Sequence, residues 1–306
     1  MIRTGGGKLD EAYRASVFDP FTARTGIEVV STAGAPAQLK AMVESGNVEW
    51  DLMQGSAELL VVYGREGLLE PLDLSMIATD RMAAGTMHDT FVLTDFAAYH
   101  VGWNTDNIRG EGPQSWADLF AIDGRIGLWK RPFQTLEAAL LADGVPLGAL
   151  YPLDADRGFA ALDRVRDKVI LWDSGAQGAQ LLIDGEVEAS AIWNGRVQEP
   201  RANGAPVDFH FNQAILVSDA WGIPRGTPNR DAAMALLAFS LTAEAQAKFS
   251  TLIPYGPVNL DALALLDDAQ KAILPALTDR TVMLSLDFWA EHGPALGERF
   301  NSWQLG

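Results

Sequence analysis

Residues 26–67, GIEVVSTAGAPAQLKAMVESGNVEWDLMQGSAELLVVYGREG, contain two short apolar runs, each followed by an amphipathic stretch. GIEVVST (26–32) and WDLMQG (50–55) read as strands, whereas PAQLKAMVESG (36–46) and SAELLVVYGREG (56–67) read as helices. Gly46 stands near the expected end of the first helix, where glycine commonly closes a helix. Strands that alternate with helices in this way predict βαβ units and a sheet rich in parallel strands.

The same alternation continues on both sides of this stretch. Upstream, residues 8–18 and 19–26 read as helices, the second with Asp19 as N-cap and Pro20 at its first helical position. From residue 230 onward the chain reads as mostly helical. We therefore expect two α/β units rather than a barrel or a sandwich. In the central part, helices are expected over 115–120, 134–144, 154–167 and 176–185, and strands over 124–129, 169–172, 187–193 and 206–211.

Two long extended runs border the central part, FVLTDFAAYHVGWNTD (91–106) and NQAILVSDAWGIP (212–224). Both are rich in aromatic and small residues, and they lie far apart in the sequence. We interpret them as crossover strands that join two lobes. The expected domains are then a discontinuous first lobe, residues 1–97 and 221–306, and an inserted second lobe, residues 98–220.

Composition excludes several classes of function. The 306 residues are 48% apolar, which is ample for buried cores, and carry a net charge of -17 that disfavours nucleic acid and anionic lipid as partners. The longest nearly uninterrupted apolar run, residues 232–241, is shorter than the ~18–20 residues of a membrane-spanning helix. The chain has no cysteine and begins without the pattern of an export signal.

Catalytic motifs are scarce. The sequence contains no GxSxG, HExxH, Walker A or GxGxxG pattern, and its four histidines lack the spacing of metal ligands. We therefore expect neither a metal nor a cofactor, and we expect a protein that is not an enzyme. A hydrolase that uses two carboxylates stays an alternative, because sequence does not give the separation of two acids.

Aromatic and charged residues stand at the ends of predicted strands and in the two extended runs. Ligands of open α/β sheets bind outside the carboxyl ends of the strands, which makes these residues candidates for a binding site. The candidates are Gln54 and Ser56 after the strand 50–55, Phe96 and Tyr99 in the first extended run, Trp193 and Arg196 after the strand 187–193, and Asp219 and Trp221 in the second extended run.

Seven segments of the chain, taken in order, resemble the extracellular solute-binding proteins of bacterial ABC importers, in particular the spermidine/putrescine group and its 4-aminobutyrate-binding relatives. The resemblance covers essentially the whole chain. It implies a type II periplasmic-binding fold, with two α/β lobes, two crossover strands as hinge and a ligand closed between the lobes. It also implies a monomer in the periplasm, without a cofactor, that delivers its ligand to an ABC permease in the inner membrane. The segments that carry it are residues 5–30, 50–73, 102–106, 113–120, 139–145, 174–196 and 222–249.

Within that family the residues favour a ligand with opposite charges at its two ends. The planar guanidinium of Arg196 suits a carboxylate, and the Asp219 carboxylate suits an ammonium. Trp193 suits the ammonium or the methylenes between the two ends. The resemblance implies the same roles, since the Trp-Asn-Gly-Arg motif and the downstream Asp have them in relatives that bind 4-aminobutyrate. We therefore favour a 4-aminobutyrate-like zwitterion, with a polyamine such as putrescine or spermidine as the alternative, and an enzyme on the same two-lobed scaffold as an alternative of another class.

Each candidate also has a structural interpretation. Arg196 could form a surface ion pair, Trp193 could be a core residue, and Asp219 could be a turn residue. Gln54 and Ser56 could cap the helix that follows them. Phe96 and Tyr99 are expected to be partly structural in any case.

Overall fold

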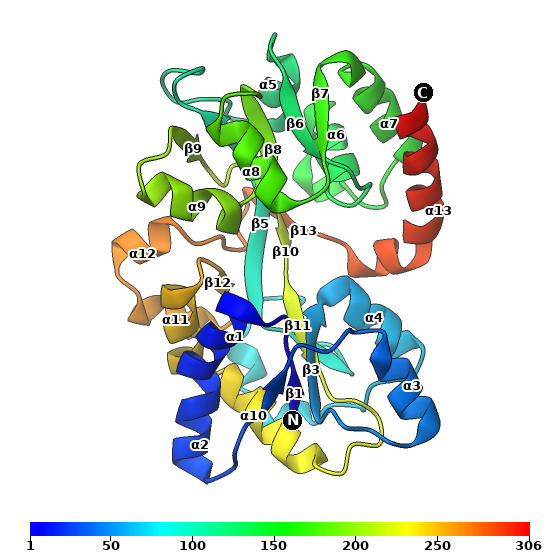
Figure 1. Cartoon of the computed structure of the whole chain (residues 1–306), viewed down its shortest axis with the longest axis vertical. Helices are drawn as coiled ribbons and strands as arrows, with labels where there is room; N and C mark the ends of the chain where they lie inside the picture. Colours follow the sequence, from blue (N-terminus) through cyan, green and yellow to red (C-terminus); the bar gives the residue numbers. More distant parts are fainter. The chain divides into compact units, whose positions relative to one another are not determined.

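The structure is a computed structural model that describes residues 1–306, and the chain divides into two compact units (Figure 1). Unit 1 comprises Met1–Phe96 and Ser218–Leu274, and unit 2 comprises Ala97–Val217 and Pro275–Gly306. The chain thus passes from one unit to the other at three points, two of which fall in the predicted extended runs. The third differs from the expected division, because residues 275–306 belong to unit 2 and not to the unit that contains the N-terminus.

Unit 1 is built on a five-stranded sheet of β1 (Ile2–Arg3), β2 (Ser31–Thr32), β3 (Leu52–Ser56), β4 (Phe91–Leu93) and β11 (Asp219–Gly222). The strand order is β2-β1-β3-β11-β4. The first three strands are parallel, whereas β11 is antiparallel to both β3 and β4. The carboxyl end of β3 therefore lies beside the beginning of β11.

The helices of unit 1 follow the apolar patterns read from the sequence. Gly26 and Gly46 end the second and third helices in the left-handed conformation, with φ of 76° and 73°. Asp19 is not an N-cap, because the π-helical residues Arg14–Phe18 connect the first two helices without a break. The helices are α1 (Gly7–Tyr13), α2 (Asp19–Thr25), α3 (Gln38–Ser45), α4 (Ala57–Arg65), α10 (Arg230–Ser240), α11 (Ala243–Leu252) and α12 (Asp268–Ala272).

Unit 2 is built on a second sheet, made of β5 (Asp95–Asn104), β6 (Ile126–Trp129), β7 (Val169–Trp172), β8 (Ala189–Trp193), β9 (Val207–Phe209), β10 (Ala214–Val217) and β13 (Thr281–Met283). The order is β13-β10-β5-β8-β6-β7, with β9 paired to the far end of β5. The first two residues of β5 belong to unit 1, where they pair with β12 (Gly256–Pro257).

The helices of unit 2 cover this sheet and enclose its core. Helix α6 is buried from Thr135 to Leu141, as expected for a helix that is apolar on all sides. The helices are α5 (Trp116–Ala121), α6 (Thr135–Ala142), α7 (Ala155–Asp163), α8 (Gly175–Ile183), α9 (Asn194–Ala202) and α13 (Leu286–Leu305). None of the helices in the protein is long and apolar enough to cross a bilayer.

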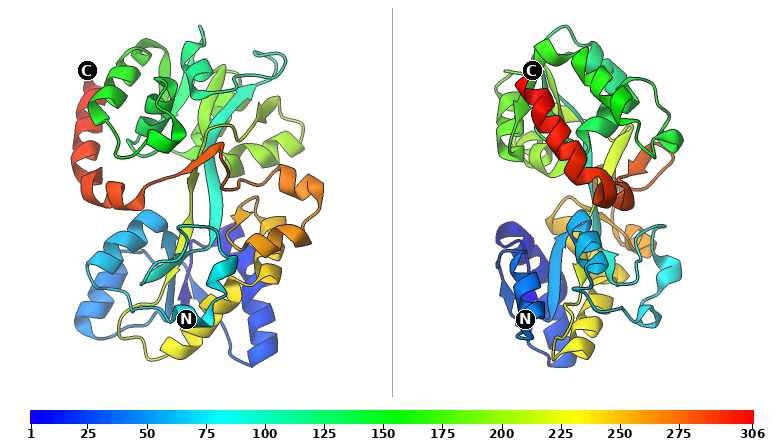
Figure 2. Two further views of the ribbon diagram at one scale, coloured as in Figure 1. Left: turned by 180° about the vertical axis from the view of Figure 1, so that it is seen from behind. Right: turned by 90° about the vertical axis from the view of Figure 1, so that its right-hand side faces the viewer.

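The C-terminal segment belongs to unit 2 because it completes the sheet and the core of that unit. Strand β13 pairs in parallel with β10, and α13 lies against α7, as Figure 2 shows. The Trp289 indole donates to the buried carboxylate of Glu137 at 2.6 Å, and Phe300 packs against Phe159. These contacts join residues more than 130 positions apart, which is why the sequence alone did not reveal them.

Candidate functional site

Asp219 is the first residue of β11. It lies at the carboxyl end of β3, where it pairs with Ser56. Ser56 ends β3 and occupies the position before α4, and two residues later the carboxylate of Glu58 lies in the first turn of that helix. Gln54 and Ser56 lie on the same face of β3, and both lower the carboxyl pKa of a nearby acid, Gln54 that of Asp219 and Ser56 that of Glu58. Ser56 makes no side-chain hydrogen bond that caps α4.

A third carboxylate lies beneath Asp219. The side chain of Asp95 is buried and accepts the Asp219 backbone N–H at 3.3 Å and the Thr94 hydroxyl at 3.1 Å. The cation that faces Asp219 is Arg3, whose guanidinium donates to the main-chain oxygens of Gly34 and Gln54 at 2.8 and 2.6 Å. Acidic groups therefore outnumber basic ones at this end of the unit 1 sheet.

The pKa values of all three carboxyl groups are raised, chiefly by burial and, for Asp219 and Asp95, also by a neighbouring acid. Burial and the charge of Glu58 raise the pKa of Asp219 to about 7. Burial raises the pKa of Glu58, and burial together with Asp219 raises the pKa of Asp95 well above its usual range. An added cation would relieve this repulsion. The Asp219–Glu58 pair is therefore suited to bind an ammonium group.

Two candidate aromatic residues lie close to these acids in the sequence and are buried. Trp221 is fully buried, with its ring 5.1 Å from that of Tyr13, and Phe96 is buried at the start of β5. Their contact with a ligand stays a prediction.

In unit 2, Trp193 ends β8 within a cluster of aromatic rings. Its ring centre lies 4.7 Å from that of Trp129 and 5.1 Å from that of Trp172, both in edge-on contact. The indole N–H donates to Gln134 Oε1 at 2.8 Å. Trp193 is only half-buried, so part of its side chain is accessible.

Tyr99 belongs to the packed side of this cluster. It is fully buried, pairs with Trp193 across β5 and β8, and its hydroxyl accepts the Trp129 backbone N–H at 3.2 Å. Burial raises the pKa of Tyr99 above its usual value. Tyr99 therefore packs beside Trp193, with a ring separation of 5.8 Å, and its contact with a ligand stays a prediction.

Arg196 lies in the first turn of α9 and is exposed. None of the ion pairs in the structure includes it, so the surface ion pair weighed from the sequence is not formed. A Cβ atom placed on Gly175, the first residue of α8, would lie 2.9 Å from Arg196 Nε and 3.1 Å from Trp193 Cε3. The missing side chain at Gly175 thus leaves space for both candidate residues.

Gly175→Ala is expected to weaken ligand binding without unfolding the protein. The new methyl group would displace Arg196 and Trp193 from their positions, and the strained side chains would lower affinity by about 1 kcal/mol, roughly fivefold. Calorimetric titration of the variant against wild type measures this loss. Gly148→Ala is the matched control, since a Cβ there meets nothing within 4 Å, and equal losses in both variants would contradict the assignment.

Sequence reasoning missed Glu58, Gln134 and Gly175. Glu58 was read as part of a helix face, although its position two residues after a strand end was a usable signal. Gln134 has a left-handed backbone conformation, with φ of 63°, which the sequence does not predict. The importance of Gly175 depends on the side chains that lie over it.

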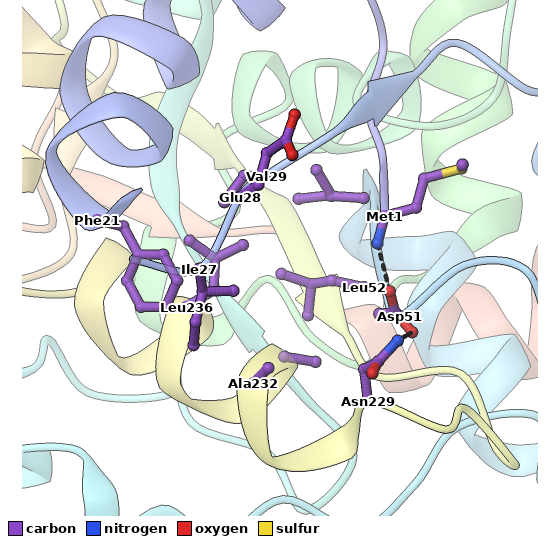
Figure 3. A pocket seen from close by; sticks show the side chains of 12 residues that line it. Met1, Phe21, Ile27, Glu28, Val29, Asp51, Leu52, Asn229, Ala232 and Leu236 are labelled. Carbon is purple, nitrogen blue, oxygen red and sulfur yellow. Dashed lines mark hydrogen bonds and ion pairs between the residues drawn. The ribbon is translucent and has the colours of Figure 1, made fainter. Parts of the chain in front are cut away.

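A groove of about 210 Å³ lies elsewhere on unit 1 (Figure 3). It is lined by apolar residues of β1, β3 and α10, among them Ile2, Leu52 and Leu236. Asp51 at its rim accepts hydrogen bonds from Thr227 and Asn229 at 2.6 and 3.0 Å. The groove is at the amino ends of the parallel strands, the opposite end from Ser56 and Asp219, so it is separate from the candidate site.

Comparison with known proteins identifies the family of the chain. The family model described as bacterial extracellular solute-binding protein matches residues 16–276. The chain is 34% identical to the gamma-aminobutyric acid-binding protein of Pseudomonas aeruginosa, over 97% of this chain and 88% of that one. It is 27% identical to the spermidine/putrescine-binding periplasmic protein 1 of Haemophilus influenzae, over 80% of this chain and 72% of that one. The solved structure of the Atu4243 GABA receptor has a TM-score of 0.90 and 35% identity, and the match covers 99% of this chain and 96% of that one.

Proposed function

We propose that this chain, which belongs to the bacterial extracellular solute-binding protein family and has its type II periplasmic-binding fold, captures a 4-aminobutyrate-like zwitterion for an ABC importer. The observation that carries the choice of ligand is the presence of two unlike charged groups at strand ends. Asp219 and Glu58 form an acidic group in unit 1, and Arg196 is an exposed guanidinium without an ion pair in unit 2.

The ligand's two ends would each meet a group of matching chemistry. The ammonium would be held by the carboxylate of Asp219, and the ligand carboxylate by the guanidinium of Arg196 in a bidentate contact. The accessible part of Trp193 would cover the methylenes between them. The names of two similar proteins support this choice. The Pseudomonas aeruginosa protein and the Atu4243 receptor are both named for 4-aminobutyrate (GABA).

A polyamine is the second candidate, and the acidic group of unit 1 favours it. Asp219 and Glu58 suit the primary ammonium of a polyamine as well as that of a zwitterion, and the Haemophilus influenzae relative is named for spermidine and putrescine. Arg196 argues against it, because a guanidinium repels the second ammonium of a diamine. The zwitterion uses both groups and is therefore the better match.

The wider function follows from the same family. The protein would bind and release its ligand unchanged, would be located in the periplasm and would pass the ligand to an ABC permease in the inner membrane. We expect it to act as a monomer and not as an enzyme. Recovery of unaltered ligand in a one-to-one complex tests this, whereas a chemically converted ligand would favour an enzyme on the same scaffold.

Titration with a panel of ligands tests the choice of ligand. We expect 4-aminobutyrate to bind at least tenfold more tightly than putrescine, spermidine, proline, betaine or taurine, because only it places a primary ammonium and a carboxylate at the two ends of a short apolar chain. Calorimetry gives the affinities, and the fluorescence of the nine tryptophans gives an independent signal of binding. Tighter binding of putrescine than of 4-aminobutyrate would establish the alternative instead.

A further inference from the structure

We propose that Glu58 is a second ligand-binding carboxylate, which shares a primary ammonium with Asp219 and so makes this subsite specific for amines that carry several N–H donors. The inference rests on the proposed function and deepens it. It assigns the ammonium to two carboxylates of unit 1 rather than to Asp219 alone.

The geometry of unit 1 places Glu58 beside Asp219. Asp219 faces Ser56 in the register of β11 and β3, and α4 begins directly after Ser56. The Ala57 backbone N–H donates to the Ser218 carbonyl oxygen at 3.1 Å, so Glu58, the next residue of α4, lies close to the start of β11. Its side chain is half-buried, which leaves part of it accessible.

A second observation marks this place as a binding site. The side chain of Gln54 is 97% buried, since its exposed fraction is 3%, and it lies on the same face of β3 as Ser56, the residue paired with Asp219. Its Oε1 atom has no hydrogen-bond partner in the structure. A buried acceptor without a partner costs free energy, and it commonly indicates a group that a ligand or a shift on binding satisfies.

Arg3, the cation that faces Asp219, donates through Nε and Nη1 to main-chain oxygens. Its charge offsets only part of the effect of burial and of Glu58, since the pKa of Asp219 stays raised. A primary ammonium has three N–H donors, enough to serve Asp219 and Glu58 together and to leave one over. A quaternary ammonium has none, so it gains no hydrogen bond from either acid.

Binding of the ammonium is expected to release a proton. The groups that face Asp219 are Arg3 on β1, Tyr13 on α1, Gln54 on β3, Glu58 on α4 and Asp95 on β5. Because the pKa of Asp219 is raised to about 7 in the free protein, the ammonium must displace a proton below that pH. Affinity should therefore be constant above pH 7 and fall about tenfold per pH unit below it.

The test is calorimetry of 4-aminobutyrate from pH 5 to pH 8 on wild type and Glu58→Gln. At pH 8 the variant should bind about tenfold more weakly. Because the neighbouring charge is gone, the pKa of Asp219 falls, so the variant should lose less affinity on acidification and the two curves should converge near pH 5. Glu44→Gln, which removes an exposed acid of α3, is the control and should follow wild type.

Selectivity gives a second readout. Wild type should prefer 4-aminobutyrate over 4-(trimethylammonio)butyrate by about 100-fold, and Glu58→Gln should reduce that preference by about tenfold. If Glu58→Gln matches Glu44→Gln in affinity, pH profile and selectivity while 4-aminobutyrate binds wild type, the inference is overturned and the proposed function stands.

Binding of putrescine distinguishes failure of the inference from failure of the proposed function. If wild type binds putrescine but not 4-aminobutyrate, the proposed ligand is wrong, and a loss of putrescine affinity in Glu58→Gln still supports the role of Glu58. If wild type binds neither amine, both the inference and the proposed function are overturned. A folded variant, checked by its melting temperature, is expected throughout because Glu58 lies in the first turn of α4 and not in the core.

Discussion

Arg196→Ala is expected to lower the affinity for 4-aminobutyrate at least about 100-fold. The guanidinium offers two parallel hydrogen bonds to a carboxylate, each charge-assisted bond contributes about 1.5–3 kcal/mol, and alanine offers none. The same substitution should spare or improve the affinity for putrescine, because it removes a positive charge that opposes a second ammonium. Calorimetric titration of both ligands on wild type and variant measures the two effects.

Arg109→Ala is the matched control for this substitution. Arg109 is also an exposed arginine of unit 2, so it changes the net charge by the same amount without touching the region of Trp193 and Gly175. It should leave both affinities unchanged. Normal binding of 4-aminobutyrate to Arg196→Ala would show that Arg196 does not hold the ligand carboxylate.

Asp219→Asn is expected to weaken every aminated ligand by about 3–5 kcal/mol, which is a factor of 100 or more. The ammonium would lose the charge of Asp219 and keep only that of Glu58, and removal of one member of a buried charge pair has costs of this size. The loss should be similar for 4-aminobutyrate and putrescine, in contrast to Arg196→Ala. Competition binding with both amines measures the difference.

The stability of Asp219→Asn distinguishes lost binding from lost folding. The pKa of Asp219 is raised in the folded protein, so its ionised form is unfavourable at pH 8 and removal of the charge should leave the melting temperature unchanged or higher. Asp89→Asn removes an exposed acid of unit 1 and should alter neither property. A folded Asp219→Asn protein with normal amine affinity would contradict the assignment of the ammonium subsite.

Local sequence patterns predicted the parts of the fold that local physics determines. The helix that ends at Gly46 and the strand and helix on either side of Ser56 were predicted within a few residues. Helix α9 was missed, because it is polar and contains Pro200, so no apolar period marks it. The long predicted strand at 26–32 is only Ser31–Thr32 in the structure.

The candidate site was predictable to the extent that it follows from strand ends. Trp193, Arg196 and Asp219 could be selected because charged and aromatic residues at such ends are candidates for ligand contact. The burial of Tyr99 could not be read from the sequence, because its neighbours Trp129 and Trp193 come from two other strands. Packing between residues far apart in the sequence decides which aromatic side chains are buried and which are partly exposed.

A crystal structure of the protein with 4-aminobutyrate tests the central claim most directly. The account predicts that the ligand carboxylate accepts from the Arg196 guanidinium and that the ammonium donates to Asp219, at the distances of about 2.7–2.9 Å typical of charge-assisted hydrogen bonds. A ligand bound in the reverse direction, or bound away from both side chains, would contradict it.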